Sequence, residues 1–250
     1  MDAFHRHFSE IYGERWTALH AALLQPPRRT TLANPFGLAE YTLDEASLLP
    51  VKHLQVQAGV RGADFCASPG GKTIAALFAV QGEVDWFCSD LSSARVARLK
   101  AVLHDCLPPP VMARVHVKAG DAGRWGLRFK ESFDRVLVDA PCSGERHLLE
   151  SARELERWSL KGSKRLAIRQ HALLCSGFDS LKPGGRLVYS TCSISPIEND
   201  GVIAKLLKSR AGEVSVETVS EERGEATEYG RIMLPDKEAC GPIYFAVITK

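Results

Sequence analysis

The stretch GADFCASPGGKT, residues 62–73, decides the fold because it carries the chain from a short apolar run into a helical one. Residues 62–66 are predicted as a buried strand and residues 73–80 as a helix. Pro69, Gly70 and Gly71 between them are residues that form tight turns. A strand that enters a helix through such a turn is typical of an α/β protein whose turn faces a ligand.

Strand-like and helical runs continue to alternate outward from this turn. The predicted strands are 62–66, 84–90, 114–118, 133–139, 185–191, 213–219 and 243–249, and the predicted helices are 73–80, 92–104, 164–181 and 196–209. This alternation predicts a Rossmann-like α/β fold with a seven-stranded, mainly parallel sheet and helices on both faces. The last strand follows Gly241-Pro242, and propensity leaves its direction open. Ligands of such sheets bind beyond the carboxyl ends of the strands.

The first 50 residues have a different pattern and are expected to form an N-terminal helical extension to a main domain at 51–250. Apolar residues recur there at helical spacing, namely Phe4, Phe8, Ile11, Tyr12, Trp16, Leu19, Leu23 and Leu24. Pro26-Pro27 ends this pattern. Residues 32–50 are predicted to be loop-rich, with a turn at Asn34-Pro35.

Composition narrows the class of protein. The chain has 250 residues, 45% hydrophobic and 25% charged, and a net charge of +2, which gives little general attraction for nucleic acid. No apolar run approaches the roughly 20 residues that span a bilayer, and the first residues do not form a secretory signal. The seven cysteines contain no CxxC pair, so we expect no metal site and a reducing compartment. The cytoplasm is the expected location, with an organellar matrix as the alternative.

The end of the turn, Gly71-Lys72-Thr73, has the letters of a nucleotide-triphosphate loop. That motif requires a glycine five residues before its second glycine, and Cys66 occupies this position. The phosphate cradle would be incomplete, which disfavours a kinase or NTPase. Two interpretations remain from the turn alone: it serves chain geometry only, or it is held open for a ligand other than phosphate.

Acidic residues follow three of the predicted strands. Asp90 ends the second strand, Asp121 follows the third, and Asp139 ends the fourth. A carboxylate after the second strand can bind both hydroxyls of a ribose. Aspartate is also a common turn and cap residue, but three at one edge of the sheet favour ligand binding. Arg95 is expected to be a solvated or capping side chain unless a ligand lies near.

Two cysteines stand at the same edge, in polar turns just past strands. Cys142 lies in DAPCSG after the fourth strand, and Cys192 lies in YSTCS after the fifth. Neighbouring strands are about 5 Å apart, so both loops can face one pocket. We expect the cysteines Cys88, Cys106, Cys175 and Cys240 to pack in the core as small buried hydrophobic residues.

A thiol beside a carboxylate suits methylation of cytosine at carbon 5. That carbon is a poor nucleophile until a thiolate adds to carbon 6 and makes the ring enamine-like. An acid such as Asp139 must stabilise the ring during the addition, and a base must later remove the carbon-5 proton. Two thiols therefore fit two steps, although these arguments do not say which thiol attacks.

The motifs together resemble the Nop/Sun family of RNA cytosine-5 methyltransferases over residues 35–250. They are DFCASPGGKT, Asp90 with Arg95 and Leu99, GDA at Asp121, DAPCSG, and LKPGGRLVYSTCSISPIEN. The resemblance implies S-adenosylmethionine as cofactor and a cytosine in rRNA or tRNA as substrate. It implies a cofactor site made of Cys66, Ala67, Ser68, Pro69, Gly70, Gly71, Lys72, Asp90, Arg95, Asp121 and Asp139.

The resemblance also implies catalytic roles for Cys192, Cys142, Asp139 and Lys72. Cys192 would be the nucleophile and Cys142 would assist release of the product. DNA cytosine-5 methyltransferases instead use the thiol of the Pro-Cys motif, which by that analogy would be Cys142. After DAPCSG the chain has Glu145-Arg146-His147, where many members of the family have a glycine-rich continuation.

Basic residues follow the Cys142 loop, namely Arg146, Arg153, Arg157, Lys161, Lys164, Arg165 and Arg169. The simplest interpretation is a solvated helix face. The position after the Cys142 loop favours an RNA-binding role, which we assign to Arg146, Lys161, Lys164 and Arg165. Trp158 and His147 are candidates for stacking on bases, and Trp158 equally for a core anchor.

A rival interpretation is an RNA-binding or ribosome-assembly factor that keeps the methyltransferase fold with little catalysis. Degenerate motifs would favour it, whereas each motif position named above is intact. We expect a monomer that binds rRNA or tRNA, no membrane association, and a role for a partner protein in choosing the substrate.

Overall fold

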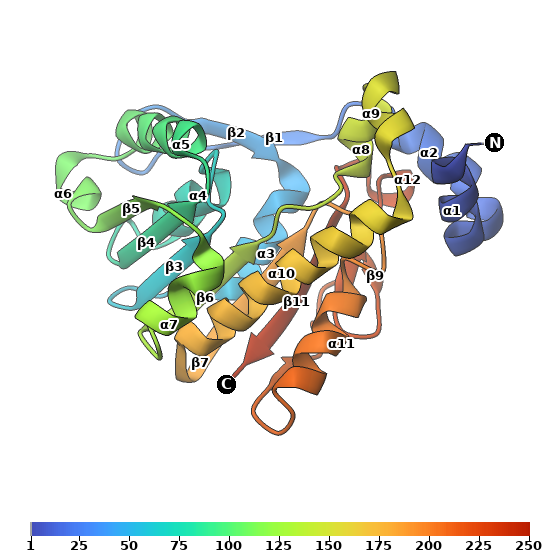
Figure 1. Cartoon of the computed structure of the whole chain (residues 1–250). Helices are drawn as coiled ribbons and strands as arrows, with labels where there is room; N and C mark the ends of the chain where they lie inside the picture. Colours follow the sequence, from blue (N-terminus) through green and yellow to red (C-terminus); the bar gives the residue numbers. More distant parts are fainter. Residues whose placement is uncertain (1) are drawn as a thin grey trace.

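A computed structural model describes residues 2–250, and its main feature is one large mixed sheet (Figure 1). Within the described residues the strand order is β5-β4-β3-β6-β7-β11-β10-β9, with β8 also paired to β11. The strands are β3 Arg61–Phe65, β4 Asp85–Asp90, β5 Val115–Ala119, β6 Phe133–Asp139, β7 Leu181–Thr191, β8 Ser215–Glu217, β9 Glu225–Ala226, β10 Arg231–Met233 and β11 Ile243–Thr249.

The expected Rossmann-like, mainly parallel sheet is confirmed. Strands β3 to β7 are parallel, and β11 lies antiparallel to β7, which fixes the direction that the sequence left open. Within residues 2–250 the sheet has nine strands, two more than the seven expected. The additional strands β9 and β10 are too short, at two and three residues, to have a period that a sequence can reveal. The strand predicted at 213–219 is reduced to β8, Ser215–Glu217.

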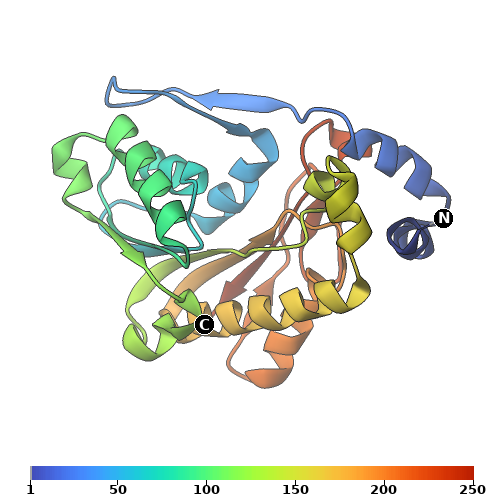
Figure 2. The same cartoon turned by 45° about the horizontal axis from the view of Figure 1, so that its top comes forward.

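Helices cover both faces of the sheet, as Figures 1 and 2 show. One face carries α10, Leu160–Ser180, with α11, Asp200–Ser209. The other face carries α3 Leu48–Leu54, α4 Gly71–Ala79 and α5 Ser93–Cys106. The strands are apolar on both faces for this reason: Val136 and Val138 belong to the hydrophobic cluster on the α10 side, and Leu137 between them belongs to the cluster on the α4 side.

Two helix starts differ from the prediction. Helix α10 begins at Leu160, four residues before 164, because the Ser159 hydroxyl caps it by accepting from the Gly162 amide. Helix α11 begins at Asp200 and not at 196, because Asn199 bonds to Thr191 and Ser193 instead of continuing a helix. Short helices fill the connections: α6 Pro109–Met112, α7 Trp125–Arg128, α8 Glu145–Leu149, α9 Ala152–Arg157, α12 Pro235–Glu238, η1 Gly13–Arg15, η2 Glu45–Ser47 and η3 Ala122–Arg124.

The N-terminal helices α1, Ala3–Tyr12, and α2, Trp16–Leu23, lie against the end of the sheet that carries α8 and α9 (Figure 1). Their apolar side chains join the same hydrophobic cluster as β6 and β7. The Tyr12 hydroxyl donates to the carbonyl of Ile194 at 2.6 Å. This contact ties the first helix to the segment that follows Cys192.

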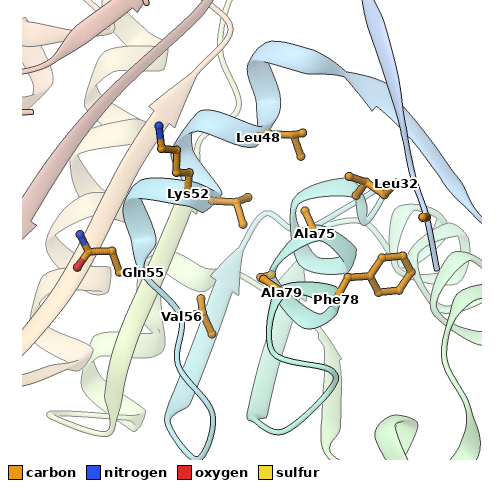
Figure 3. A pocket seen from close by; sticks show the side chains of 11 residues that line it. Leu32, Leu48, Lys52, Gln55, Val56, Ala75, Phe78 and Ala79 are labelled. Atoms are coloured by element: carbon orange, nitrogen blue, oxygen red, sulfur yellow. The ribbon is translucent and has the colours of Figure 1, made fainter. Parts of the chain in front are cut away.

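The region predicted as loop-rich contains a β-hairpin, and this part of the prediction is wrong. Strand β1, Arg29–Leu32, pairs antiparallel with β2, Tyr41–Asp44. The hairpin passes over α3 and α4, and an aliphatic cavity of about 430 Å³ lies beneath it (Figure 3). Lys52 is the one titratable residue among those that line this cavity, so it offers little catalytic chemistry.

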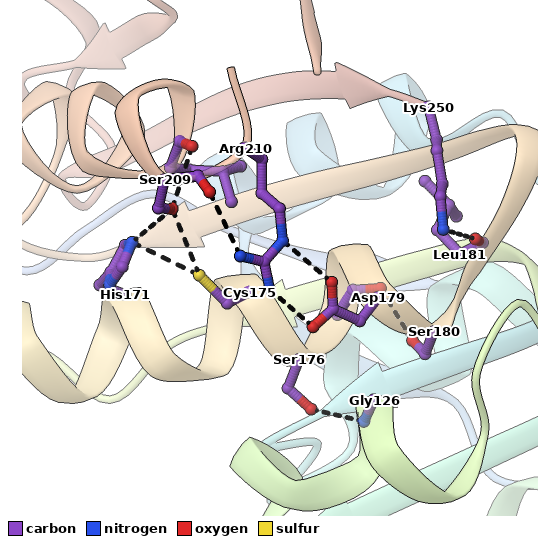
Figure 4. Close-up of polar contacts among 12 residues, drawn as sticks. Gly126, His171, Cys175, Ser176, Asp179, Ser180, Leu181, Ser209, Arg210 and Lys250 are labelled. Carbon is purple, nitrogen blue, oxygen red and sulfur yellow. Dashed lines mark hydrogen bonds and ion pairs between the residues drawn. The ribbon is translucent and has the colours of Figure 1, made fainter. Parts of the chain in front are cut away.

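Polar contacts fasten α10 to α11 on the outer layer (Figure 4). Arg210 forms a two-pronged ion pair with Asp179, with contacts of 3.1 and 2.9 Å. Cys175 is half-buried beside His171 and Ser209, whereas Cys88, Cys106 and Cys240 are buried as expected. Among the helices of residues 2–250, none combines the length and apolar character that crossing a bilayer requires.

Candidate active site

The glycine turn after β3 is packed so closely that only glycine fits its corner. The amide of Ala67 donates to the carbonyl of Ser89 on β4 at 2.8 Å, which holds the turn against the next strand. Gly70 has φ of 117°, and a Cβ there would stand 3.0 Å from Leu99. A Cβ on Gly71 would stand 2.8 Å from the Tyr41 ring of the hairpin. The geometric interpretation of the turn therefore holds for these two glycines, while the residues on either side face a cavity.

Asp90, at the carboxyl end of β4, is bound to Arg95 across the mouth of this turn. Arg95 Nε lies 2.9 Å from Asp90 Oδ2, and Arg95 Nη2 donates to the carbonyl of Ser68 at 2.7 Å. The Ser68 hydroxyl returns a hydrogen bond to the carbonyl of Arg95 at 2.9 Å. The Asp90 carboxyl group is only 6% exposed while the Arg95 side chain is 53% exposed. Movement of Arg95 would thus free a preformed carboxylate for the hydroxyls of a ribose.

Asp121 is placed differently from the other two strand-end carboxylates. It caps the short helix η3 by accepting from the Gly123 amide at 3.0 Å, and its side chain is exposed. It does not line the large cavity described next. Asp121 thus shapes the turn after β5, and its expected contact with the cofactor stays a prediction.

A cavity of about 900 Å³ lies beyond the carboxyl ends of β3, β6 and β7. Its lining includes, from the cofactor site implied by the resemblance, Cys66, Ser68, Pro69, Lys72, Arg95 and Asp139. The two thiols Cys142 and Cys192 line the same cavity. Its volume is that of a site for a ligand of nucleoside size, and its Asp139 carboxylate suits a ligand with a positive centre such as S-adenosylmethionine. These residues fit the implied cofactor.

Lys72 and Asp139 form an ion pair inside the cavity, with Nζ and Oδ2 2.8 Å apart. The Ser190 hydroxyl donates to the other carboxylate oxygen of Asp139 at 2.7 Å. Burial acts to lower the pKa of Lys72, but the charge and hydrogen bond of Asp139 outweigh it and leave the pKa raised. Lys72 is therefore an ammonium group, fixed between the turn and the Asp139 carboxylate.

The two cysteines meet. Cys142 Sγ and Cys192 Sγ lie 3.0 Å apart, and both side chains are partly buried. Their hydrogen bond, followed by burial, raises the pKa of the Cys142 thiol well above its ordinary value. Cys142 therefore holds its proton at neutral pH.

Two buried glutamates join the loops that carry these thiols, and sequence reasoning assigned a role to neither. Glu198, in the loop after Cys192, accepts from the Ser143 amide at 2.9 Å and also from the Ser143 hydroxyl. Glu145, the first residue of α8 directly after the Cys142 loop, accepts from the Ser193 hydroxyl at 2.9 Å and from the Ile194 amide at 3.1 Å. Each loop thus supplies the carboxylate that holds the other. The sequence signal was their position, two glutamates three and six residues after the two cysteines.

The charges around the two sulfur atoms differ. Glu145 and Glu198 are close enough to Cys142 to contribute to its raised pKa, after the hydrogen bond between Cys142 and Cys192 and after burial. The interaction of Lys72 with Cys192 contributes to the raised pKa of Lys72, after the opposing effect of burial and the effect of Asp139. A negative sulfur is favoured beside an ammonium group and disfavoured beside carboxylates. The carboxylates therefore lie on the Cys142 side of the pair, and the ammonium group of Lys72 lies on the Cys192 side.

The four residues assigned to RNA binding separate into two groups. Lys161, Lys164 and Arg165 are exposed on the first turns of α10. Arg146 instead donates to the carbonyl of Gln25, which ties the Cys142 loop to the linker after α2. The ring of Trp158 packs against those of Phe4 and Phe8, with centroid distances of 5.3 and 5.8 Å. Trp158 therefore anchors α1 in the core, which was one of the two roles predicted for it.

Comparison with known proteins agrees with this geometry. Residues 51–249 match the family described as 16S rRNA methyltransferase RsmB/F. The chain is 35% identical over 244 residues to the 5-cytosine rRNA methyltransferase NSUN4 of Bos taurus, covering 90% of the chain and 62% of that protein. It is 34% identical over 222 residues to the mitochondrial tRNA (cytosine(34)-C(5))-methyltransferase of Mus musculus, covering 84% of the chain and 63% of that protein.

Among solved structures, NSun6 from Pyrococcus horikoshii with SFG superposes with a TM-score of 0.73 and 25% identity. The match covers 84% of this chain and 53% of that one. The chain therefore spans less than two thirds of the length of these relatives. The match over residues 51–249 and the identity to the two mammalian proteins show that the chain belongs to the 16S rRNA methyltransferase RsmB/F family.

Proposed function

We propose that this protein transfers a methyl group from S-adenosylmethionine to carbon 5 of a cytosine in rRNA or tRNA, through a covalent bond between Cys192 and carbon 6. The observation that carries the proposal is the pair of thiols, 3.0 Å apart, facing one cavity with Lys72 and Asp139. Small-molecule methylation needs no such pair. The names of the bovine and mouse relatives favour cytosine in rRNA or tRNA.

The first step is addition of the Cys192 thiolate to carbon 6 of the ring. A carbon–sulfur bond forms, and the displaced electron pair of the double bond makes carbon 5 nucleophilic. The Lys72 ammonium group lines the same cavity as Cys192, and a positive charge beside a sulfur stabilises a thiolate. As the ring gains negative charge, Asp139, held between Lys72 and Ser190, takes a proton from the Lys72 ammonium group and donates it to ring nitrogen 3, which leaves Lys72 neutral and the ring uncharged.

S-adenosylmethionine, when bound, would supply an electrophilic methyl group to carbon 5, with its sulfonium–methyl bond broken and the neutral thioether as the leaving group. The turn residues Cys66, Ser68 and Pro69 would hold the cofactor, with Asp90 at its ribose. Arg95 must then release Asp90, whose carboxylate it now covers.

Release of the product requires loss of the carbon-5 proton and of the carbon–sulfur bond. The electrons of the broken C–H bond restore the ring double bond, and Cys192 leaves as a thiolate. Cys142 is the adjacent group for this step, because its sulfur contacts that of Cys192. In the free enzyme it holds its own proton, so it must lose that proton before it can act as the base.

Labelled S-adenosylmethionine with total RNA, followed by nucleoside analysis, tests the activity. We expect 5-methylcytidine in the rRNA or tRNA fraction. Tight RNA binding without any 5-methylcytidine would favour an assembly factor that retains the fold.

The cytoplasm remains the first proposal for location, with an organellar matrix as the second. The mouse relative is named as mitochondrial, which favours testing the matrix as well. A monomer that uses a partner protein for substrate choice also remains a proposal.

A further inference from the structure

A second cavity of about 470 Å³ opens beside the reaction cavity, between the Cys142 loop, α9 and the start of α10. The two cavities share Cys142, Ser143 and Leu148 in their linings. A linear polymer whose reacting residue lies at Cys192 can therefore place its neighbouring residue in this second cavity.

The charge of this second cavity points to an anion. Arg157, Arg165 and Arg169 line it, and within residues 2–250 none of the three makes a hydrogen bond or an ion pair. Arginines elsewhere in the molecule, such as Arg15 and Arg210, are bound by carboxylates at 2.6 to 3.1 Å. Three free guanidinium groups around one hollow suit a phosphate group, which they can bind in a two-pronged manner.

One part of the remaining wall of this cavity is apolar. Leu148, Leu166 and Trp158 form it, and Trp158 is fixed from behind by Phe4 and Phe8 of α1. An apolar wall next to a phosphate site suits the base of a nucleotide, because a base has a flat apolar face.

Arg169 connects the two cavities electrostatically. Burial raises the pKa of the Cys66 thiol to about 12, and the positive charge of Arg169 opposes this rise. Arg169 thus acts on a residue of the cofactor turn while it lines the second cavity.

We propose that this second cavity is the subsite for the nucleotide next to the target cytosine, with its phosphate on Arg157, Arg165 and Arg169 and its base against the Trp158 wall. The inference rests on the proposed function, because it takes the target to lie at Cys192. It extends RNA recognition from an exposed helix face to a defined hollow, and it adds Arg157 and Arg169 to the residues that contact RNA.

The test uses the full chain and a short single-stranded RNA that carries the unmodified target cytosine. Arg165→Ala/Arg169→Ala should raise KM for RNA at least tenfold and change kcat less than threefold. The matched control is Arg98→Ala/Lys100→Ala on α5, which removes the same charge from exposed positions outside both cavities and should leave KM unchanged. A neutral methylphosphonate at the linkage next to the cytosine should raise KM of the wild type but not of the Arg165→Ala/Arg169→Ala variant.

Two results would overturn the subsite: an unchanged KM in the arginine variant, or an equal methylphosphonate effect in wild type and variant. Fluorescence anisotropy with a labelled 12-nucleotide RNA measures RNA binding without methyl transfer. It therefore distinguishes failure of the subsite from failure of the proposed function. If the wild type binds RNA but transfers no methyl group, the proposed function falls, and a tenfold loss of RNA affinity in the variant still supports the subsite. Binding of polyglutamate in preference to RNA would show an acidic protein partner and contradict the subsite.

Discussion

Cys142 Sγ lies 3.0 Å from Cys192 Sγ, although 49 residues separate the two cysteines in the chain. Parallel pairing of β6 with β7 brings the two loops to the same edge of the sheet. The hydrogen bonds of Glu198 to Ser143 and of Glu145 to Ser193 then hold the loops together. Contact between the thiols is therefore built by the fold and does not depend on a bound substrate.

This contact predicts that a mild oxidant links the two sulfurs and stops methyl transfer. Diamide would take one hydrogen from each thiol and leave a Cys142–Cys192 disulfide. The reaction should be faster at higher pH, because the raised pKa of Cys142 keeps that thiol protonated near neutrality. Peptide mapping should show the bond, and dithiothreitol should restore activity. A Cys175→Ser control should respond like the wild type, and persistence of full activity after diamide would contradict the contact.

Glu145 predicts a pH dependence of stability. Burial, followed by the charge of Glu198, raises its pKa from 4.5 to about 7. Between these values the folded state holds a proton that the unfolded state has lost, so stability falls as pH rises. The slope reaches about 1.4 kcal/mol per pH unit for this one group.

Urea unfolding of the wild type and of Glu145→Gln between pH 5 and pH 8 checks this dependence. The variant should lose less stability than the wild type over that range. Exposed Glu150→Gln is the matched control and should follow the wild type. Parallel curves for Glu145→Gln and wild type would show that Glu145 does not titrate there.

Variants of the Lys72–Asp139 pair are expected to show different effects on thermal stability and on activity. Asp139→Asn leaves the buried Lys72 ammonium without its anion, so it should destabilise the fold and reduce kcat by about 10²-fold or more. Lys72→Met/Asp139→Asn should recover thermal stability, because no charge is left unpaired, but not activity. Recovery of activity in the double variant would remove this pair from catalysis.

Asp90 is expected to contribute strongly to the affinity for the cofactor. Asp90→Ala should weaken binding of S-adenosylmethionine about 10- to 100-fold in isothermal titration and leave RNA binding unchanged, because a two-pronged contact to ribose is lost. Asp85→Ala, at the other end of the same strand, is the control and should bind the cofactor like the wild type. Equal affinities for Asp90→Ala and wild type would place the ribose elsewhere.

The sequence predicted the sheet best where strands are continuous apolar runs between turn residues. Strands β6 and β11 have the predicted ends. The centre of 133–139 is the buried run Val136–Val138, and 243–249 is buried up to its last residue. The hairpin at Arg29–Leu32 and Tyr41–Asp44 has alternate half-exposed polar residues, and its pairing depends on packing over α4. No local pattern marks such a pairing.

For the site, motif spacing predicted which residues meet but not how they are held. Cys66, Lys72, Asp139, Cys142 and Cys192 do line one cavity. Glu145 and Glu198 look like surface residues in the sequence and are buried only because each loop covers the other. Arg146 lines the same cavity and also donates to the carbonyl of Gln25, a contact that the sequence does not reveal; its contact with RNA stays a prediction.

The central claim is that Cys192 attacks the cytosine and Cys142 assists release. Denaturing electrophoresis of enzyme incubated with RNA and labelled S-adenosylmethionine tests it most directly, with both cysteine variants compared to wild type. The account predicts that Cys192→Ala forms no covalent RNA adduct and that Cys142→Ala accumulates a labelled one. An adduct in Cys192→Ala together with none in Cys142→Ala would contradict it and exchange the two roles.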